Sequence, residues 1–118
     1  MKAEKTLVPL CSASEVEPGC AFRAEHGGCV YAVFNVGGAL YVTQDECTHG
    51  PSSLAEGFVL DDEVECCFHQ GRFHIPTGRA SCAPATEPLK TWKVELIDGK
   101  VCIDPDKPQP AAPQQTTE

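Results

Sequence analysis

The chain has no long hydrophobic segment and no extended helical pattern. None of its apolar runs approaches the ~20 residues of a membrane span. The apolar patch near the N-terminus, residues 7–10, contains Pro9 and is too short for a signal peptide. No stretch repeats its apolar residues every 3.6 positions over the length of a long helix. These absences predict a cytoplasmic protein that has no membrane partner and is built mainly from strands.

Positive charge is scarce, and one long interval contains none. The 118 residues include 17 acidic and nine basic side chains, for a formal net charge of −8, and no Lys or Arg lies between Arg23 and Arg72. A field of this sign repels phosphate, which excludes nucleic acid and anionic membrane as partners. The acidic stretch from Asp45 to Glu65 serves either solubility or docking of a basic partner. The acidic residues of the interval are Glu25, Asp45, Glu46, Glu56, Asp61, Asp62, Glu63 and Glu65.

The eight cysteines lack the regular spacing of a disulfide framework. Without a secretory signal, thiols are expected to stay reduced, and a chain of this length can bury a core without cross-links. A free thiol in an apolar run packs like a small apolar side chain. We therefore expect packed thiols at Cys11, Cys20, Cys29, Cys82 and Cys102, which leaves the other cysteines as candidate metal ligands.

Short β-rich runs recur between turns that contain glycine or proline, as is typical of an all-β sandwich or barrel. Residues 12–16 are expected to form one helical turn. The pairs Gly37-Gly38 and Asp98-Gly99 predict tight hairpins, and residues 76–78 predict a further turn. The predicted strands cover residues 6–10, 20–24, 29–36, 39–43, 64–66, 72–74, 90–96 and 100–103.

The end of the chain differs in composition from the rest. From Pro105 onward it contains four prolines and no apolar residue larger than alanine. Such a segment buries too little apolar surface to offset the entropy of ordering it. We therefore expect one domain over residues 1–104 and a disordered Pro/Gln-rich tail over residues 105–118.

Two short segments each combine one cysteine with one histidine. Cys47 and His49 are two positions apart, Cys66 and His69 are three apart, and 16 residues separate His49 from Cys66. Each segment follows a predicted strand and contains glycine, so the chain can turn around a small object. Zinc accepts these residue types but usually takes its cysteines and its histidines as separate pairs. A Rieske [2Fe–2S] centre needs two thiolates on one iron and two imidazoles on the other, which two facing loops of this composition supply.

At these motifs the chain resembles the Rieske-type ferredoxins of bacterial aromatic-ring-hydroxylating dioxygenase systems, such as the biphenyl and naphthalene dioxygenase ferredoxins. The resemblance implies an all-β, Rieske-type antiparallel β-sandwich with a small cluster-binding subdomain of two loops. It also implies a [2Fe–2S] cluster whose ligands are Cys47, His49, Cys66 and His69. Cys67 stands where the family usually has proline and is an alternative ligand, although the spacing to His69 favours Cys66. The matching segments are residues 47–50, 66–73, 77–80, 82–84 and 90–94.

The role implied by the resemblance is that of a one-electron carrier and not of an enzyme. A flavin-dependent reductase, itself reduced by NAD(P)H, would supply the electrons, and a terminal oxygenase would receive them. The iron site of such an oxygenase requires two more histidines. Only His26 and His74 remain, and they are expected in a surface turn and on a solvated strand face. A shuttle that docks two partners in turn is expected to be a monomer.

The resemblance also indicates a low reduction potential. In high-potential Rieske proteins a disulfide joins the two ligand loops, and the equivalent positions here are Ser52 and Phe68. Those proteins also direct two hydroxyl groups at the cluster, from positions that correspond to Gly71 and Phe73. Hydrogen bonds to the cluster sulfurs raise the potential, so their absence predicts a value near the low end of the Rieske range, around −150 mV.

Other functions remain open at this point. One is that of a Rieske subunit in another reductase or demethylase system, such as the small subunit of a nitrite reductase. Another is that of a structural zinc-binding interaction module. A Cys–His hydrolase is less favoured, because no oxyanion motif or orienting partner can be named.

Overall fold

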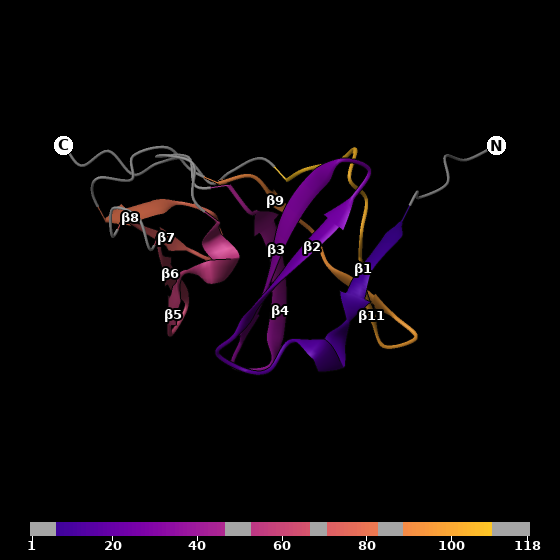
Figure 1. Cartoon of the computed structure of the whole chain (residues 1–118), viewed down its shortest axis with the longest axis horizontal. Helices are drawn as coiled ribbons and strands as arrows, with labels where there is room; N and C mark the ends of the chain where they lie inside the picture. The colour runs from indigo at the N-terminus through magenta and orange to yellow at the C-terminus, as the bar shows by residue number, and fades with distance from the viewer. Residues whose placement is uncertain (1–6, 47–52, 67–70, 83–88, 110–118) are drawn as a thin grey trace.

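Three antiparallel sheets make up the fold, in a computed structural model that describes residues 7–46, 53–66, 71–82 and 89–109. In Figure 1 the second sheet lies between the other two. The first sheet has the order β1 (Val8–Ser12), β11 (Lys100–Ile103), β10 (Glu95–Ile97). The second has the order β2 (Ala21–His26), β3 (Cys29–Val36), β4 (Ala39–Gln44), β9 (Thr91–Trp92). The third has the order β5 (Phe58–Leu60), β6 (Glu63–Glu65), β7 (Arg72–His74), β8 (Ala80–Cys82).

Tight two-residue turns connect neighbouring strands where the sequence predicts hairpins. Between β3 and β4, Gly37 and Gly38 have φ angles of 59° and 99°. Between β10 and β11, Asp98 and Gly99 have φ angles of 53° and 78°. Two successive positive φ angles match the twist of the flanking strands, which is why Gly and Asp-Gly are favoured at such turns. Both predicted hairpins are therefore confirmed.

Strand β3 forms a wall between two hydrophobic cores. Tyr31 and Val33 pack into one cluster with side chains from β1, β4 and β11. Ala32 and Phe34 point to the other side, into a cluster that includes residues of β6 and β7. All four side chains are buried. A strand that is covered on both faces explains why residues 30–34 form a continuous apolar run and do not alternate with polar residues.

The ends of several predicted strands are wrong, and two strands were missed. The first strand is Val8–Ser12 and not residues 6–10, and a short 3₁₀ turn, η1 (Ala13–Glu15), follows it as predicted. The predicted strand 90–96 is two strands, because Thr91–Trp92 pairs with β4 whereas Glu95–Ile97 pairs with β11 in another sheet. Strands β5 and β8, each three residues long, were not predicted.

Two of the predicted packed thiols are instead on the surface. Cys11 and Cys102 are buried, as predicted, whereas Cys20 and Cys29 are exposed. Cys20 directly precedes β2 beyond a turn, and Cys29 is the first residue of β3 beside the Gly27-Gly28 turn. A position at a strand end lacks the neighbours that would cover it, although the adjacent sequence is apolar. The side chain of Cys82 lies outside the described residues.

The described part of the predicted tail contacts the body of the fold. Trp92 packs edge-on against Tyr31, with ring centroids 4.9 Å apart, and its indole N–H donates to the carbonyl of Pro105 at 3.2 Å. The backbone N–H of Gln109 donates to the carbonyl of Thr91 at 2.7 Å. Residues 105–109 therefore lie along the edge strand β9, which the tail's composition did not predict. Trp92 is a packed residue of the sheet. No helix among the described residues is long and apolar enough to cross a membrane.

Candidate metal centre

One of the four predicted ligands, Cys66, lies in the described part of the chain. It follows β6 directly and is 1% exposed. Its backbone N–H donates to the carbonyl of Gly71 at 2.7 Å, so this hydrogen bond joins the two ends of the segment between Cys66 and Gly71. Cys47, His49 and His69 lie outside the described residues, as does the alternative ligand Cys67.

Asp45 holds together the two ends of the segment that contains Cys47 and His49. Glu46 and Ser53 form an isolated antiparallel bridge across this segment. The carboxylate Oδ1 of Asp45 accepts the Ser53 hydroxyl at 2.9 Å and the Ala55 N–H at 3.0 Å. Its backbone carbonyl accepts the Leu54 N–H at 2.7 Å. These bonds bring the chain back beside the end of β4 after the predicted ligands.

The other carboxylate oxygen of Asp45 faces an arginine. The Nε of Arg23 lies 3.6 Å from Oδ2, and the Asp45 side chain is only 6% exposed. A buried carboxylate is stable when hydrogen bonds and an opposite charge replace its water, and Asp45 has both. Sequence analysis treated Asp45 only as part of an acidic stretch. An Asp directly after a strand often bonds nearby backbone N–H groups, and that signal could have identified its role.

A close backbone approach fixes the position of Leu89, which directly follows residues 83–88, the third internal segment outside the described residues. The N–H of Leu89 donates to the carbonyl of Gly78 at 2.7 Å. Gly78 has a φ of +77°, and a Cβ atom there would lie 2.6 Å from the Leu89 carbonyl oxygen. Only glycine permits both this backbone conformation and this contact. The predicted turn at residues 76–78 is thus confirmed and has a packing role.

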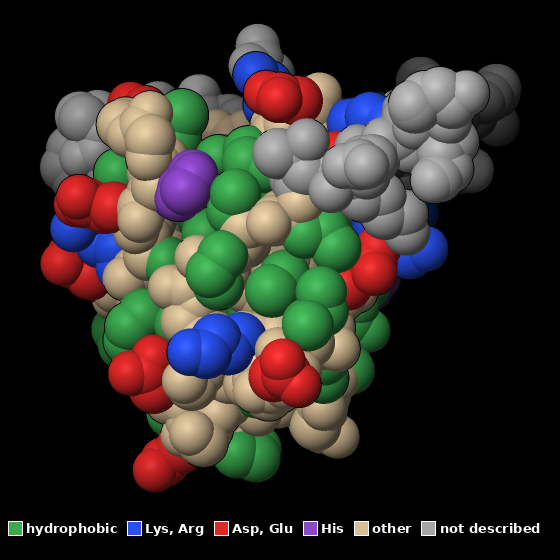
Figure 2. Space-filling view, turned by 90° about the vertical axis from the view of Figure 1, so that its right-hand side faces the viewer, with side chains coloured by type: hydrophobic (Ala, Val, Ile, Leu, Met, Phe, Trp, Pro, Cys, Tyr) green, Lys and Arg blue, Asp and Glu red, His purple; other side chains and the backbone are tan. Residues whose placement is uncertain are grey.

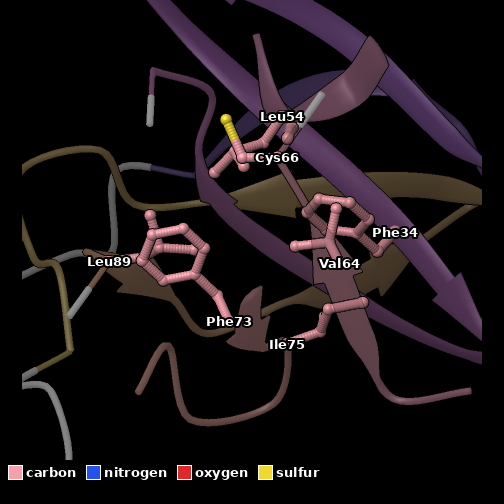
Figure 3. Close-up of a cluster of buried hydrophobic side chains, with 8 residues drawn as sticks. Phe34, Leu54, Val64, Cys66, Phe73, Ile75 and Leu89 are labelled. Atoms are coloured by element: carbon pink, nitrogen blue, oxygen red, sulfur yellow. The ribbon is translucent and has the colours of Figure 1, made fainter. Parts of the chain in front are cut away.

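The three internal segments outside the described residues, 47–52, 67–70 and 83–88, are all flanked by residues of one apolar cluster. Leu54, Cys66 and Leu89 each lie next to or one residue from a different segment, and all three belong to the same buried group. Figure 3 shows Cys66 beside Leu54, with Phe73 and Leu89 in the same group. Because these anchors share one core, the segments that contain the predicted ligands emerge from a common region of the fold.

The described residues that flank the predicted ligand segments fit an iron–sulfur centre. No group of three or more potential metal-binding side chains occurs among them, because Cys66 is the one predicted ligand that they include. Its buried thiol at the end of a closed hairpin is suited to ligate iron as a thiolate, since apolar surroundings shield the cluster from water.

His74 has a structural environment that differs from the solvated face predicted for it. Its Nε2 lies 3.1 Å from Oδ2 of Asp62, and its Nδ1 lies 2.8 Å from the hydroxyl of Thr77. These contacts link the β5–β6 turn to the turn that follows β7. His26 is exposed at the end of β2, as predicted.

This architecture defines a class of protein: a small all-β molecule in which one buried core flanks the segments that contain the predicted ligands. Residues 6–93 match the sequence profile of the Rieske [2Fe-2S] domain. The chain therefore belongs to the Rieske [2Fe-2S] domain family, and its cofactor is a Rieske-type [2Fe–2S] cluster. The fold class and the cofactor predicted from the sequence are both confirmed.

Relatives and solved structures cover almost the whole chain. The biphenyl dioxygenase ferredoxin subunit of Pseudomonas sp. (strain KKS102) is 43% identical over 84% of this chain and 92% of its own length. The structure of Sphingomonas yanoikuyae B1 ferredoxin superposes with a TM-score of 0.81 and 38% identity, and covers 91% of this chain and 100% of its own. A chain in the complex of reduced oxygenase and oxidized ferredoxin of carbazole 1,9a-dioxygenase gives a TM-score of 0.79 and 38% identity, over 86% of this chain and 94% of its own.

Proposed function

We propose that this chain is the ferredoxin component of an aromatic-ring-hydroxylating dioxygenase system. It carries one electron at a time from a flavin-dependent NAD(P)H reductase to a terminal oxygenase, and it is not itself an enzyme. The observation that carries this proposal is the 43% identity, over nearly the full length of both chains, to the biphenyl dioxygenase ferredoxin subunit. The similar chain in a complex of ferredoxin and oxygenase supports the same partner class.

The ligand set that we propose is Cys47, His49, Cys66 and His69. When bound, the [2Fe–2S] cluster supplies storage for a single electron. The protein's contribution is to hold the ligand segments together, and Asp45, Gly71 and Leu89 anchor one segment each. An electron carrier has to bring its centre close to a partner's surface, which supports ligand segments at the end of the molecule.

We further propose a low reduction potential for this centre, around −150 mV. Phe73 is fully buried in the core cluster, and Gly71 has no side chain. Neither residue can donate a hydroxyl hydrogen bond to a cluster sulfur, and such bonds raise the potential. A redox titration of the purified holo-protein measures this value. A potential well above the low end of the Rieske range would contradict the argument.

The remaining features belong to the same proposal. A cytoplasmic location suits a carrier that meets an NAD(P)H-dependent reductase, and a monomer suits successive docking to two partners. Residues 1–104 would form the domain, with a Pro/Gln-rich tail over residues 105–118, in which Pro105 and Gln109 bond to β9. Size-exclusion chromatography with light scattering tests the oligomeric state directly.

The decisive experiment has two stages. First, iron, zinc and acid-labile sulfide are measured in protein purified without oxygen, and about two irons and two sulfides per chain are expected. One zinc without sulfide would leave a zinc-binding module as the function. Second, the holo-protein is combined with a purified flavin-dependent reductase and a purified aromatic-ring oxygenase, and NADH-dependent product is measured with and without it. A loaded protein that accepts electrons but never supports the oxygenase would indicate another Rieske system.

A further inference from the structure

Among the described residues, neither the core nor another sheet covers one face of the β5–β8 sheet. In β5 the side chain of Val59 is partly buried against the core, whereas Phe58 and Leu60 point outward and are 61% and 41% exposed. The register places Phe58 opposite Glu65 and Leu60 opposite Glu63. Side chains alternate along a strand, so these four lie on the same face. We call this set, Phe58, Leu60, Glu63 and Glu65, the lateral face.

The charge around the lateral face is acidic and only partly neutralised. Arg72 lies 3.8 Å from Glu63 and 3.5 Å from Glu65, so a single guanidinium serves two carboxylates. Asp61 and Asp62 follow Leu60 in the β5–β6 turn, and both are exposed. The lateral face therefore presents two apolar side chains next to excess negative charge.

The other end of the molecule has a different surface. Figure 2 shows hydrophobic side chains there, interrupted by Lys or Arg and by Asp or Glu. Strand β10 also exposes two apolar residues, Leu96 and Ile97, at 58% and 42%. Lys100 lies opposite Ile97 in the register, so the charge beside this pair is not uniformly negative. Two similarly exposed apolar pairs thus occur in different electrostatic settings.

The lateral face lies next to the candidate metal centre. Glu65 directly precedes Cys66, and Phe58 is its cross-strand partner. Phe58 and Leu60 are about 7 Å apart along the strand, given a rise of ~3.3 Å per residue. A standard protein interface covers about 800 Å² on each partner. A partner that docks beside Cys66 therefore reaches the lateral face within an ordinary footprint.

We propose that the lateral face is a docking surface for a protein with an apolar centre and a basic rim, and that Phe58 is its anchor. The inference rests on the proposed function, because it assigns the surface to an electron-transfer partner. Charge complementarity selects this occupant, since an exposed aromatic side chain flanked by acids fits an apolar pocket flanked by Lys or Arg. A second copy of this chain would bring like charges together, which disfavours self-association here.

Oxidised cytochrome c, a basic protein with lysines around its exposed haem edge, is the probe that tests this surface. Chemically reduced holo-protein is mixed with it in a stopped-flow instrument, and one electron passes from each reduced protein to one ferric haem. The variant Phe58→Ser with Leu60→Ser is expected to lower the second-order rate constant about tenfold at low salt. The matched control, Leu96→Ser with Ile97→Ser, removes equally exposed apolar side chains and is expected to leave the rate within about twofold.

Two further readouts separate the possible failures. Iron and sulfide content and the rate with ferricyanide, a small oxidant, are expected to be the same in all three proteins. A protein without iron and sulfide would instead refute the proposed function. Equal rates with cytochrome c for all three loaded proteins would overturn the docking proposal alone, and so would an equal decrease in both variants. A decrease specific to the β5 pair supports it, and the rates of all three proteins are expected to fall as salt screens the surrounding charges.

Discussion

Two regions of this molecule, the β2–β4 strands and the β5–β8 sheet, are stabilised in different ways. The β2–β3–β4 hairpins have strands of six, eight and six residues, and β3 is buried on both faces. The β5–β8 sheet has strands of three residues each. Such short strands contribute few ladder hydrogen bonds and gain stability only through what packs against them. The body is thus stabilised by its own strands, whereas the β5–β8 sheet depends on what packs against it.

This difference suits an electron carrier. The short strands share one small core with the residues that flank the predicted ligand segments. Leu54, Cys66 and Leu89 share that core, although they are far apart in the sequence. Binding of a metal centre that the unfolded chain cannot form stabilises the folded state. A cluster held by the proposed ligands would therefore compensate for the short strands of the β5–β8 sheet.

The largest difference between the β2–β4 strands and the β5–β8 sheet is expected when the predicted thiolate ligand is removed. Cys66→Ser is expected to abolish the cluster, because a hydroxyl is a poor replacement for a thiolate on iron. Iron and sulfide should fall from about two each per chain to near zero. Hydrogen exchange should then accelerate in β5–β8 while β2–β4 stays protected.

Cys67→Ser is the matched control for this experiment, since it changes the adjacent thiol. It is expected to retain iron and sulfide. The reverse pattern, with cluster lost only in the Cys67 variant, would identify Cys67 as the ligand. Equal loss of protection in the β2–β4 strands and the β5–β8 sheet after cluster removal would contradict the idea that these two regions are stabilised differently.

The second test concerns two glycines with nearly the same backbone. Gly78 and Gly99 have φ angles of 77° and 78°, but only at Gly78 would a Cβ meet backbone atoms, with the Leu89 oxygen at 2.6 Å. Gly99→Ala is expected to cost about 1–2 kcal/mol for the left-handed conformation. Gly78→Ala adds overpacking, for a total of about 2–4 kcal/mol. Urea unfolding of the two variants measures the difference, and equal losses would show that the contact with Leu89 is unimportant.

How far sequence reasoning reached depended on whether the deciding interactions were local. The two hairpins were predictable, because Gly37-Gly38 and Asp98-Gly99 determine their own backbone. Strand β3 was predictable from its apolar run. The division of residues 90–96 was not, since it depends on which distant strand pairs with each half. The same holds for Cys20 and Cys29, whose exposure depends on neighbours from elsewhere in the fold.

The candidate centre followed the same rule. Spacing and residue type indicated the four proposed ligands, because metal preference is a property of the side chains themselves. The anchors were not predicted, since a hydrogen bond from Ala55 to Asp45 exists only after the chain has folded back. The docking surface was anticipated only as acidic charge. Its apolar part could be recognised only from the register of β5 on β6.

The third test removes the anchor Asp45. Asp45→Ala leaves the Ala55 N–H and the Ser53 hydroxyl without their acceptor and is expected to cost about 1–3 kcal/mol. Asp45→Asn keeps one acceptor oxygen and should cost less. Because the bonds lie at the base of a ligand segment, the visible absorption of the cluster is expected to decay before Trp92 fluorescence changes during unfolding. Simultaneous loss of both signals would indicate that Asp45 stabilises the whole molecule equally.

The smallest effect tests the body alone. Burial, and secondarily the charge of Glu15, raise the pKa of Cys11 from 9.0 to about 11. Between pH 9 and pH 11 the unfolded chain therefore loses this proton while the folded protein keeps it, so stability falls as the pH rises. The expected contribution is about 1.4 kcal/mol at pH 10 relative to pH 8.

Cys11→Ala removes this titration, so the difference in unfolding free energy between the two proteins should shrink by that amount at pH 10. Because Cys11 packs in the core between β1 and β3, Trp92 fluorescence should report the change in the cluster-free protein as well as in the loaded one. A pH effect that required the cluster would mean that the body of the fold and the β5–β8 sheet are coupled and not independently stabilised.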